Sequence, residues 1–400
     1  MDKIRLNKLF FFLLFFIVIS GFSSTALSRE PDTAKTSPPG TPKIAVILPL
    51  SGPFADYGEA LQQGYMLGFA KVTATANIVR PRYRIEYLDS EASPETARTL
   101  INILSAEGEV AIATGTPLNA TAWTAVRACE KNGLPYLVAG ADQDNLIGKD
   151  TTFSFRLTQK KSSLEQLLTK YITTRKTKIK SMGIIYAEAT ADAVNKARRI
   201  RRLGTRQGID LTIWKSWKEY SKTKNNFYDL LNTIREHQPQ ILFLITGQTV
   251  ANRLWEQGRR LEIMPPATIS IPVHCLNSLS RSDPKAAPRP AAQLIYASPW
   301  SKTGLNLSTG EDISPCRNRL LAQGSAAAEV ILSCLQKSRN LSAPAIIQSM
   351  ESLKTDTVYG KVSFSSAPSG HQNKLTWYLC RNGEDNQAQV IFPVAGSNKR

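Results

Sequence analysis

Strands and helices alternate along this chain in two successive series, and this alternation restricts the possible fold more than any other feature. In the first series, apolar runs typical of strands occupy residues 43–50, 83–89, 110–114 and 134–138, with segments of helical periodicity between them. Regular alternation of strand and helix is typical of βαβ units built around a parallel sheet. The unbroken apolar run at residues 43–50 predicts a strand that is buried on both faces.

A second series of the same kind follows in residues 162–271, with predicted strands at residues 181–186, 211–214, 240–245 and 268–271. With 400 residues, 42 % of them apolar, the chain is long enough for two lobes that each have a core. We therefore expect two doubly wound α/β lobes. Later elements are predicted in the order strand, helix, helix, strand and strand at residues 294–297, 317–337, 343–352, 361–364 and 375–379.

The N-terminus has the features of a secretory signal peptide at residues 1–28. Basic residues precede an apolar run at residues 9–19, and a small-x-small cleavage site follows at residues 26–28. The apolar run is shorter than the roughly 20 residues that span a bilayer. We expect cleavage after Ser28, and then a proline-containing flexible lead-in at residues 29–41.

The net charge of +18 suggests an anionic neighbour, such as a membrane surface, a cell-wall polymer or an acidic ligand. The densest basic cluster lies on the predicted helix between Lys196 and Arg202. This helix has two interpretations. It is either an ordinary solvated face or a docking site for an anionic surface, such as lipid headgroups or a partner protein.

The sequence offers no constellation typical of an enzyme, a metal site or a nucleic-acid-binding protein. Motifs such as G-x-S-x-G, HExxH and the P-loop are absent, and the three histidines are widely separated. We therefore expect no catalytic residues, no metal and no cofactor. At most two disulfide bridges can form, and the pairing is left open among Cys129, Cys275, Cys316, Cys334 and Cys380.

Several linked motifs resemble one known family, the type I periplasmic binding proteins, specifically the branched-chain amino-acid-binding receptors of ABC transporters. The motifs follow the order and spacing of that family from about residue 43 to residue 380. They are the opening strand and loop at residues 44–58, the segment at 89–94, the loop at 115–121 and the late G-x-V-x-F strand at 360–364.

The resemblance implies a particular lobe organisation. Three crossovers would join two Rossmann-like lobes, with residues 42–157 and 297–358 in the first lobe and residues 158–296 and 359–395 in the second. A ligand would bind in the cleft at the carboxyl ends of the strands, and closure of the lobes would bury it.

Candidate ligand contacts in the first lobe lie on three loops. Ser51 and Tyr57 follow the first strand, where the alternatives are a turn cap and a packing residue. In the family, the third-strand loop holds the ligand carboxylate, and its positions match Asn119 and Thr121 here, with N-capping by Asn119 as the alternative. Asp142 stands where the family usually has a ligand-binding Thr. It would repel a carboxylate but accept from an ammonium or hydroxyl group, unless it forms a solvated Asx turn.

In the second lobe, the matching stretches supply Thr246, Gln248 and Ser270 as candidate contacts. The family often has a ligand-binding acid in the stretch that matches residues 269–274, and this chain has none there. The resemblance implies a receptor in the periplasm that captures a small polar ligand and presents it to an ABC permease in the inner membrane. The alternative is a ligand-sensing or cell-wall-associated regulatory protein that uses the same fold.

Overall fold

The computed structural model describes eleven segments of the chain. They are residues 42–75, 83–175, 179–189, 191–217, 227–271, 293–298, 315–358, 360–365, 370–373, 377–382 and 388–393. The predicted signal peptide and lead-in at residues 1–41 lie outside them.

The first sheet contains seven strands in the order β13-β14-β5-β4-β3-β1-β2. Neighbouring strands from β14 to β2 pair in parallel, and β13 pairs antiparallel with β14. The strands are β1 (Lys43–Leu48), β2 (Arg84–Asp89), β3 (Val110–Gly115), β4 (Tyr136–Val138), β5 (Ser154–Arg156), β13 (Phe364–Ser365) and β14 (His371–Asn373).

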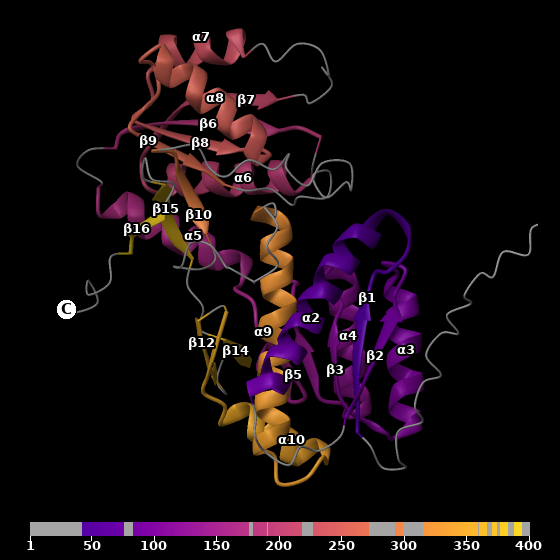
Figure 1. Ribbon diagram of the computed structural model, residues 1–400. Coiled ribbons are helices and arrows are strands. Elements are labelled where there is room, and N and C mark those ends of the chain that lie inside the picture. Colours follow the sequence, from indigo (N-terminus) through magenta and orange to yellow (C-terminus); the bar gives the residue numbers. More distant parts are fainter. Residues whose placement is uncertain are drawn as a thin grey trace, which may run out of the picture. The chain divides into compact units, whose positions relative to one another are not determined.

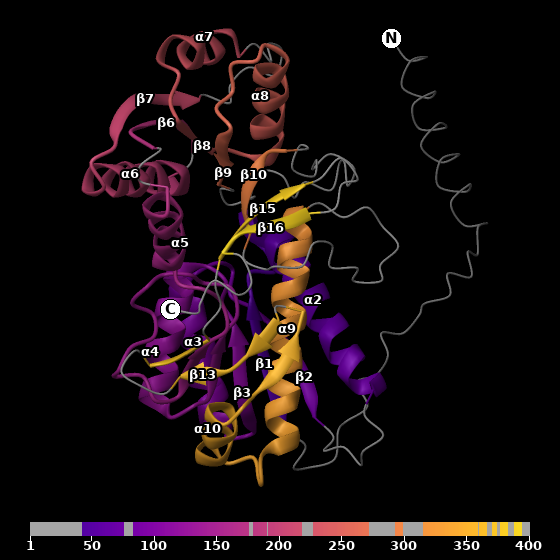
Figure 2. The ribbon, with the colours of Figure 1, turned by 90° about the vertical axis from the view of Figure 1, so that its left-hand side faces the viewer.

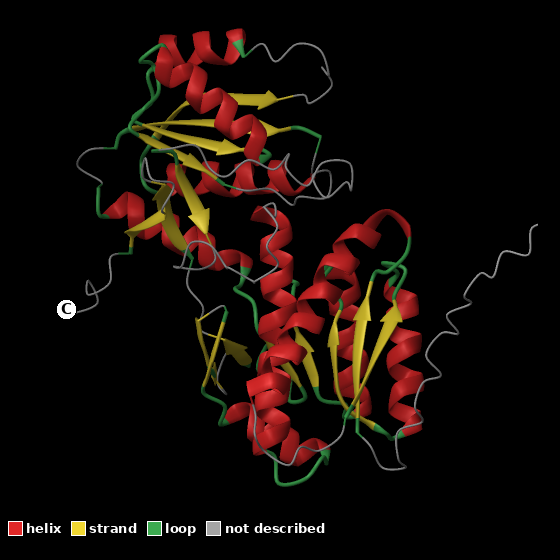
Figure 3. Cartoon of the chain, in the orientation of Figure 1, coloured by secondary structure: helices red, strands yellow, loops and turns green. Residues whose placement is uncertain are grey.

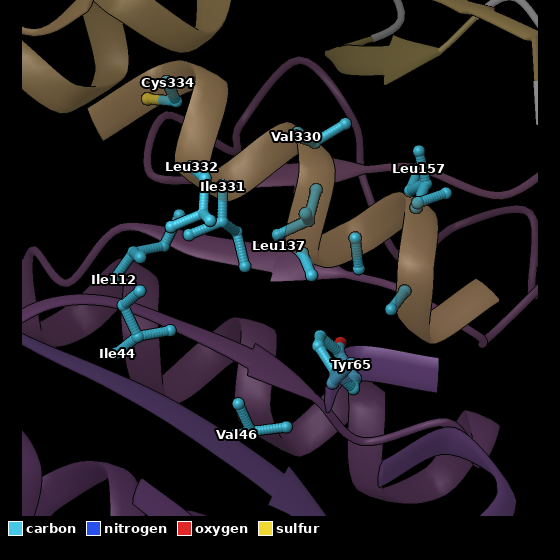
Figure 4. Packing of buried hydrophobic residues seen from close by; sticks show 14 of the residues in the cluster. Ile44, Val46, Tyr65, Ile112, Leu137, Leu157, Val330, Ile331, Leu332 and Cys334 are labelled. Carbon is cyan, nitrogen blue, oxygen red and sulfur yellow. The ribbon is translucent and has the colours of Figure 1, made fainter. Parts of the chain in front are cut away.

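Helices cover both faces of this sheet (Figure 1). Ile44 and Val46 of β1 point to one face, where they pack with α2 (Ala55–Thr75), α9 (Pro315–Lys337) and α10 (Ala343–Glu351). Figure 4 shows this core, with side chains of α9 beside those of β1, β3 and β4. Ala45 and Ile47 alternate to the opposite face and pack with α3 (Pro94–Glu107) and α4 (Asn119–Asn132). Because both faces are buried, β1 is an unbroken apolar run, as the sequence predicted.

The second sheet also contains seven strands, in the order β16-β15-β10-β9-β8-β6-β7. The five central and edge strands from β10 to β7 pair in parallel, whereas β15 and β16 are antiparallel additions beside β10 (Figure 2). The strands are β6 (Ser181–Ala187), β7 (Asp210–Trp217), β8 (Ile241–Ile245), β9 (Ala267–Ser270), β10 (Ile295–Ser298), β15 (Tyr378–Asn382) and β16 (Ala388–Phe392).

The second sheet is doubly wound as well, with helices on both faces of its strands (Figure 3). Phe243 of β8 packs with α5 (Lys161–Thr173) and α6 (Ala191–Arg206). Leu242 and Leu244 pack on the other face with α7 (Tyr228–His237) and α8 (Gln248–Arg260). Each fully buried side chain of this size contributes about 1.5–3 kcal/mol to folding.

The chain passes between the two sheets three times: after β5, after β10 and after β14. The predicted fold class, two doubly wound lobes joined by three crossovers, is therefore confirmed. The third crossover differs in position from the expectation. Residues 359–395 were all expected in the second lobe, but β14 pairs with β5, and β13 joins β14. Phe364 of β13 accordingly packs in the first core.

Two short strands, β5 and β11 (Thr355–Thr357), were not predicted from the sequence pattern. β5 has only three residues and one of them is Arg156, so it lacks the apolar run that marks a buried strand. β11 pairs antiparallel with β12 (Gly360–Val362) in a separate two-stranded sheet, and β12 overlaps the strand predicted at residues 361–364. The predicted helix that follows β1 begins slightly earlier, because a 3-10 turn at Gly52–Phe54 leads directly into α2.

Candidate functional site

The predicted site residues lie on or near loops at the carboxyl ends of strands, which is where open α/β sheets bind ligands. In the first sheet these loops follow β1, β3 and β4, and in the second they follow β8 and β9. The predicted residues are Ser51, Tyr57, Asn119, Thr121, Asp142, Thr246, Gln248 and Ser270.

The loop after β1 is held by the carboxylate of Asp89 at the end of β2. Its Oδ1 accepts from the backbone N–H groups of Leu50 and Glu91, both at 2.8 Å. Burial works to raise the pKa of Asp89, but these bonds and one from the Ser51 hydroxyl outweigh it and keep the pKa below its usual value. Ser51 is exposed and orders this loop, so its contact with a ligand stays a prediction.

Tyr57 is a core residue with a polar end. Its side chain is only 4 % exposed and belongs to the cluster that packs α2 against the first sheet. Burial raises the pKa of its hydroxyl, the positive charge of Arg319 lowers it, and the negative charge of Asp142 raises it further. The ring therefore packs, as the structural alternative predicted, while the hydroxyl lies within electrostatic reach of two charged side chains.

Asn119 and Asp142 bind each other and thereby connect two of the loops. The Asn119 Nδ2 group donates to Oδ1 of Asp142 at 3.0 Å. In return, the Asn119 Oδ1 atom accepts from the backbone N–H groups of Asp142 and Gln143, both at 3.1 Å. Leu118, not Asn119, occupies the N-cap of α4. The loop after β3 is therefore fixed to the loop after β4 by side-chain hydrogen bonds.

Thr121 is engaged within its own turn of helix. Its hydroxyl donates to the carbonyl oxygen of Leu118 at 2.9 Å, and the residue is only 1 % exposed. This arrangement uses the hydroxyl's one proton locally. A ligand contact through Thr121 stays a prediction that would need this hydrogen bond to be replaced.

The second sheet presents polar groups with fewer partners. The Thr246 hydroxyl, at the end of β8, has a long hydrogen bond of 3.2 Å to the neighbouring Gly247 carbonyl. Ser270, the last residue of β9, is fully buried, and its Oγ atom has no hydrogen-bond partner among the described residues. Gln248 begins α8, but its side chain lies outside the described part. A buried hydroxyl without a partner is costly, and it is therefore a natural point of contact for a ligand.

Three cations near these loops were missed by the sequence analysis. Arg156 is fully buried at the end of β5, where it donates through Nη2 to the Gln143 carbonyl, while its Nε and Nη1 atoms have no partner in the ranges that the structure describes. Burial lowers the pKa of Arg156 to about 10. Lys160 lies close by, and burial together with the charge of Arg156 lowers its pKa as well. Arg319 of α9 is half-buried, and its positive charge lowers the pKa of Tyr57.

One signal could have revealed Arg156. A single arginine in the short segment Ser154–Arg156 is unusual for a strand, and a charge there points to a functional or structural role. Arg319 lies near the start of a helix that also carries Arg317 there, and two basic residues in the first turns of a helix are not a comparable signal.

The predicted basic helix corresponds to α6, and its cations fall into two groups. Lys196 pairs with Asp192 at 2.7 Å, and Arg199 pairs with Glu165 at 2.6 Å. Burial lowers the pKa of Lys196, although Asp192 opposes this. The other arginines of the helix are exposed, namely Arg198, Arg201, Arg202 and Arg206.

The described residues also bear on disulfide bonds, metal sites and membrane-spanning helices. Cys129, Cys334 and Cys380 are buried free thiols. Within the described ranges, no three His, Cys, Asp or Glu side chains are grouped as metal ligands would be. No helix in these ranges has both the length and the hydropathy of a membrane-spanning segment.

Two doubly wound lobes joined by three crossovers, with polar groups at the carboxyl ends of both sheets, are the architecture of the type I periplasmic binding proteins. The model of the periplasmic binding protein family matches residues 41–387, so the chain belongs to that family, whose members are solute-binding receptors of ABC transporters and not enzymes.

Solved structures show the same fold at low sequence identity. A protein described as a branched-chain amino acid ABC transporter from Rhodospirillum rubrum is 16 % identical, with a TM-score of 0.64 over 88 % of this chain and 100 % of that one. LivJ from Streptococcus pneumoniae, in complex with isoleucine, is 17 % identical, with a TM-score of 0.61 over 88 % and 99 %. A solute-binding protein from Rhodopseudomonas palustris, in complex with 3,4-dihydroxybenzoic acid, is 15 % identical, with a TM-score of 0.61 over 88 % and 96 %. No curated protein matches the chain in sequence.

Proposed function

We propose that this protein is a periplasmic receptor of an ABC importer, which captures a small polar ligand by closing its lobes and presents it to a permease in the inner membrane. The observation that carries the proposal is the family match over residues 41–387 of a chain with polar groups at the carboxyl ends of both sheets. The relatives in complex bind isoleucine and 3,4-dihydroxybenzoic acid, so an amino acid or a related organic acid is the expected ligand.

A thermal-shift panel of amino acids, amides, sugars and organic acids tests this proposal. A ligand that binds only the folded protein stabilises it by mass action and so raises the melting temperature. At a ligand concentration of 100 times the dissociation constant, the free energy of unfolding increases by about 2.7 kcal/mol. We expect at least one member to raise the melting temperature in a saturable way. A shift from none of them would contradict the receptor proposal and favour the regulatory alternative.

One observation favours that alternative. Asn119 and Asp142 satisfy each other, so part of the hydrogen-bonding capacity of the first lobe is already used without a ligand. A regulator that needs only a rigid scaffold would benefit from this arrangement. Co-purification distinguishes the two functions, since a receptor should bind its permease only when liganded.

The location of the protein is also a proposal. We infer that the signal peptide is cleaved after Ser28, because the residues before it carry the required basic, apolar and small-residue regions. N-terminal sequencing of the protein from a periplasmic extract tests this, and the expected first residue is Arg29. A chain that keeps its first 28 residues and pellets with membranes would contradict it.

We further propose that the exposed face of α6 contacts the anionic surface of the membrane. Arg198, Arg201, Arg202 and Arg206 recur at three- and four-residue spacings, so they share one side of the helix. The guanidinium of Arg201 also lies 5.4 Å from the centre of the Trp214 ring, which adds an aromatic group to the cations. Each such cation contributes about 1 kcal/mol near an anionic surface.

Co-sedimentation with vesicles tests the contact. Wild-type protein should pellet with vesicles that contain 30 % or so of anionic lipid, and less as salt increases, since charge attraction is screened. The variant Arg198→Gln, Arg201→Gln and Arg202→Gln should lose this binding, whereas Arg259→Gln and Arg260→Gln at the end of α8 should keep it. Equal binding by both variants would contradict a role for α6.

A further inference from the structure

The loop after β4 comprises residues 139–153, up to the start of β5, and it contains no helix or strand. Connections of this length without regular structure are uncommon in compact domains and usually have a function. Between residues 139 and 148, only Asn145 is exposed. Because a buried loop has to satisfy its backbone polar groups elsewhere in the chain, its hydrogen-bond partners show what it is connected to.

The loop carries Asp142, a candidate ligand contact, and is fixed on one side to the N-terminal end of α4. Asn119 of α4 makes this connection: its Nδ2 group donates to Oδ1 of Asp142, and its Oδ1 atom accepts from the backbone N–H groups of Asp142 and Gln143. Two candidate ligand contacts therefore belong to one hydrogen-bonded unit, and a ligand that displaces one of them also acts on the other.

On the other side, the same loop caps α5, the first helix after the first crossover. The first N–H groups of a helix have no partner within it, and an acidic side chain near them is favourable. Here the backbone N–H of Ser162 donates to Oδ1 of Asp144 at 2.9 Å, and that of Lys161 donates to the Asp142 carbonyl at 2.8 Å. The N-cap residue Lys160 makes no side-chain cap. A loop of the first lobe thus supplies the cap of a helix in the second.

The segment that joins β5 to α5 is bonded to the loop as well. The Nη2 group of Arg156, which is fully buried, donates to the Gln143 carbonyl. The hydroxyl of Thr158 donates to the Ala141 carbonyl at 2.9 Å. Together with the Asp142 carbonyl, three consecutive carbonyl groups of the loop are therefore bound by residues of the first crossover.

The strand β14, which leads into the third crossover, contacts the far end of the loop. Its three residues are polar and yet buried. Nε2 of Gln372 donates to the Ile147 carbonyl at 3.1 Å, and Nδ2 of Asn373 donates to the Leu157 carbonyl in the first crossover at 3.2 Å. Because a buried polar side chain costs more than an apolar one, these residues indicate a specific role in connecting the loop to both crossovers.

The backbone just before β14 also packs on the loop. Gly370 has φ of 75°, and a Cβ there would lie 2.3 Å from the carbonyl oxygen of Gly148. Only glycine combines this backbone angle with so close an approach. One contact through a side chain and one through the backbone therefore fix the far end of the loop to the strand before the third crossover.

We propose that the loop after β4 couples ligand contact at Asp142 to the first and third crossovers, with Asp144 and Gln372 as positioning residues. A ligand that displaces Asp142 also displaces a carbonyl group that binds α5. Because the chain passes between the lobes at these crossovers, a change in their hydrogen bonds changes the relative free energies of the open and closed lobes. The assignment deepens the receptor proposal and rests on it.

Hydrogen exchange in the free mature protein tests the coupling without any ligand. Asn119→Ala loosens the loop from its α4 side, and the hydrogen bonds of Asn119 described here end at Asp142 and Gln143. We expect the amides of residues 157–162 and 371–373 to exchange about 5- to 10-fold faster in this variant. Asn132→Ala at the other end of α4 is the matched control.

The control removes bonds that do not involve the loop. Asn132 donates to Asn102 and to the Ala128 carbonyl, both at 2.9 Å, so its loss should leave exchange in both crossover segments unchanged. Melting temperatures check that each variant is folded. Should Asn119→Ala not fold, the variant of the next experiment makes the same test from the other end of the loop.

The reciprocal experiment perturbs β14. Gln372→Leu keeps the approximate size of the side chain but removes its hydrogen bond, and exchange in residues 139–148 should become about 5- to 10-fold faster. His371→Phe on the same strand is its control. The His371 ring contacts Glu351 of α10 at 2.9 Å instead of the loop, so this change should leave exchange in the loop unaltered.

Small-angle scattering with solutes tests the role of Asp144 in lobe closure. The solutes are isoleucine and 3,4-dihydroxybenzoate, which are bound in two of the relatives. At saturation, the wild-type protein should become more compact. Asp144→Ala removes the cap of α5 and should bind the same solute about 5- to 10-fold more weakly, with a smaller compaction even at saturation. Asp144→Asn keeps an oxygen acceptor and should restore most of both.

The outcomes separate this assignment from the receptor proposal. Faster exchange in the loop of Asn119→Ala with unchanged exchange in both crossover segments overturns the coupling and leaves the receptor proposal in place. Full compaction of Asp144→Ala, or the same behaviour from Asp144→Asn and Asp144→Ala, overturns the role of Asp144. A wild-type protein that neither solute compacts contradicts the receptor proposal for these solutes, and the exchange results alone then support or overturn the coupling.

Discussion

The loops after β1, β3 and β4 in the first sheet differ from those after β8 and β9 in the second in how completely their polar groups are hydrogen-bonded. In the first sheet, Asn119 bonds to the side chain and backbone of Asp142, and the Asp89 carboxylate holds the β1 loop; Arg156 at the end of β5 is the exception, with two nitrogen atoms that lack a partner among the described residues. In the second sheet, Ser270 is buried without a partner among the described residues, and Thr246 has one long hydrogen bond. Both sheets have the same number of strands and the same winding, so the difference lies in the loops and not in the architecture.

This difference suggests that the two sets of loops contribute to ligand binding in different ways. A lobe whose loops are already hydrogen-bonded presents a fixed shape, because its groups need no rearrangement when a ligand arrives. A lobe with unused polar groups gains the most from contact with a ligand. We therefore infer that the loops after β1, β3 and β4 are organised before binding and that the loops after β8 and β9 are completed by binding.

The largest expected effect on stability comes from a comparison of two glycines near strand ends. Gly115 is the last residue of β3, and Gly247 lies two residues after the end of β8. Gly115 has φ of 110°, and a Cβ there would lie 2.1 Å from the carbonyl oxygen of Ile47, whereas Gly247 has φ of −60° and open space around it. Gly115→Ala should destabilise the protein by about 3–5 kcal/mol, because both the backbone angle and the overlap are unfavourable. Gly247→Ala should change stability by less than about 0.5 kcal/mol. Urea unfolding measures both, and equal effects would break the comparison.

The second effect concerns the link between two loops of the first lobe. Asn119→Ala removes one donor from Asp142 and leaves the backbone N–H groups of Asp142 and Gln143 without their acceptor. The expected cost is about 2–4 kcal/mol, because half-buried groups lose their partners. Hydrogen exchange should show faster exchange in the segments 115–121 and 139–146. Unchanged exchange there would show that the loops are ordered by something other than Asn119.

A third test uses pH. The folded-state pKa of Asp89 lies below its ordinary value of 3.8, so the stabilisation from this carboxylate is present above that value and is lost as the pH falls through the folded pKa. Asp89→Asn should lower stability at pH 7 by about 1–2 kcal/mol, since the hydrogen bonds to a charged acceptor are lost. The difference between the variant and the wild type should shrink below pH 3.8. A difference that stays constant down to pH 2 would show that the charge of Asp89 does not matter.

The same comparison shows which parts of the molecule the sequence could predict. Buried parallel strands are continuous apolar runs, so β1, β3, β6 and β8 were located from the pattern of residues 43–50, 110–114, 181–186 and 240–245. β5 was not, because three residues that include Arg156 carry too little periodicity. The third crossover was misplaced for a related reason, since β13 and β14 have only two and three residues, and β14 pairs with β5, a strand more than 200 residues earlier in the sequence.

The site was predictable only as far as its loops. Positions at the ends of strands follow from the order of elements, and therefore Asn119 and Asp142 were found on adjacent loops. Their bond to each other could not be predicted, because it depends on the spacing of β3 and β4 in three dimensions. The positive charge of Arg319, on a helix 262 positions later in the sequence (319 − 57), lowers the pKa of Tyr57, an effect that no local pattern encodes.

The smallest expected effect tests the second lobe directly. Ser270→Ala removes a buried hydroxyl that has no partner among the described residues, so stability without ligand should stay the same or rise by up to about 1 kcal/mol. Thr268→Ala on the same strand is the matched control: its hydroxyl donates to the Pro265 carbonyl at 2.6 Å, so its removal should destabilise. With a ligand bound, Ser270→Ala should reduce the melting-temperature shift if the second lobe is completed by binding. A loss of stability in the free Ser270→Ala protein would mean that this hydroxyl already has a partner, and the contrast between the two lobes would then disappear.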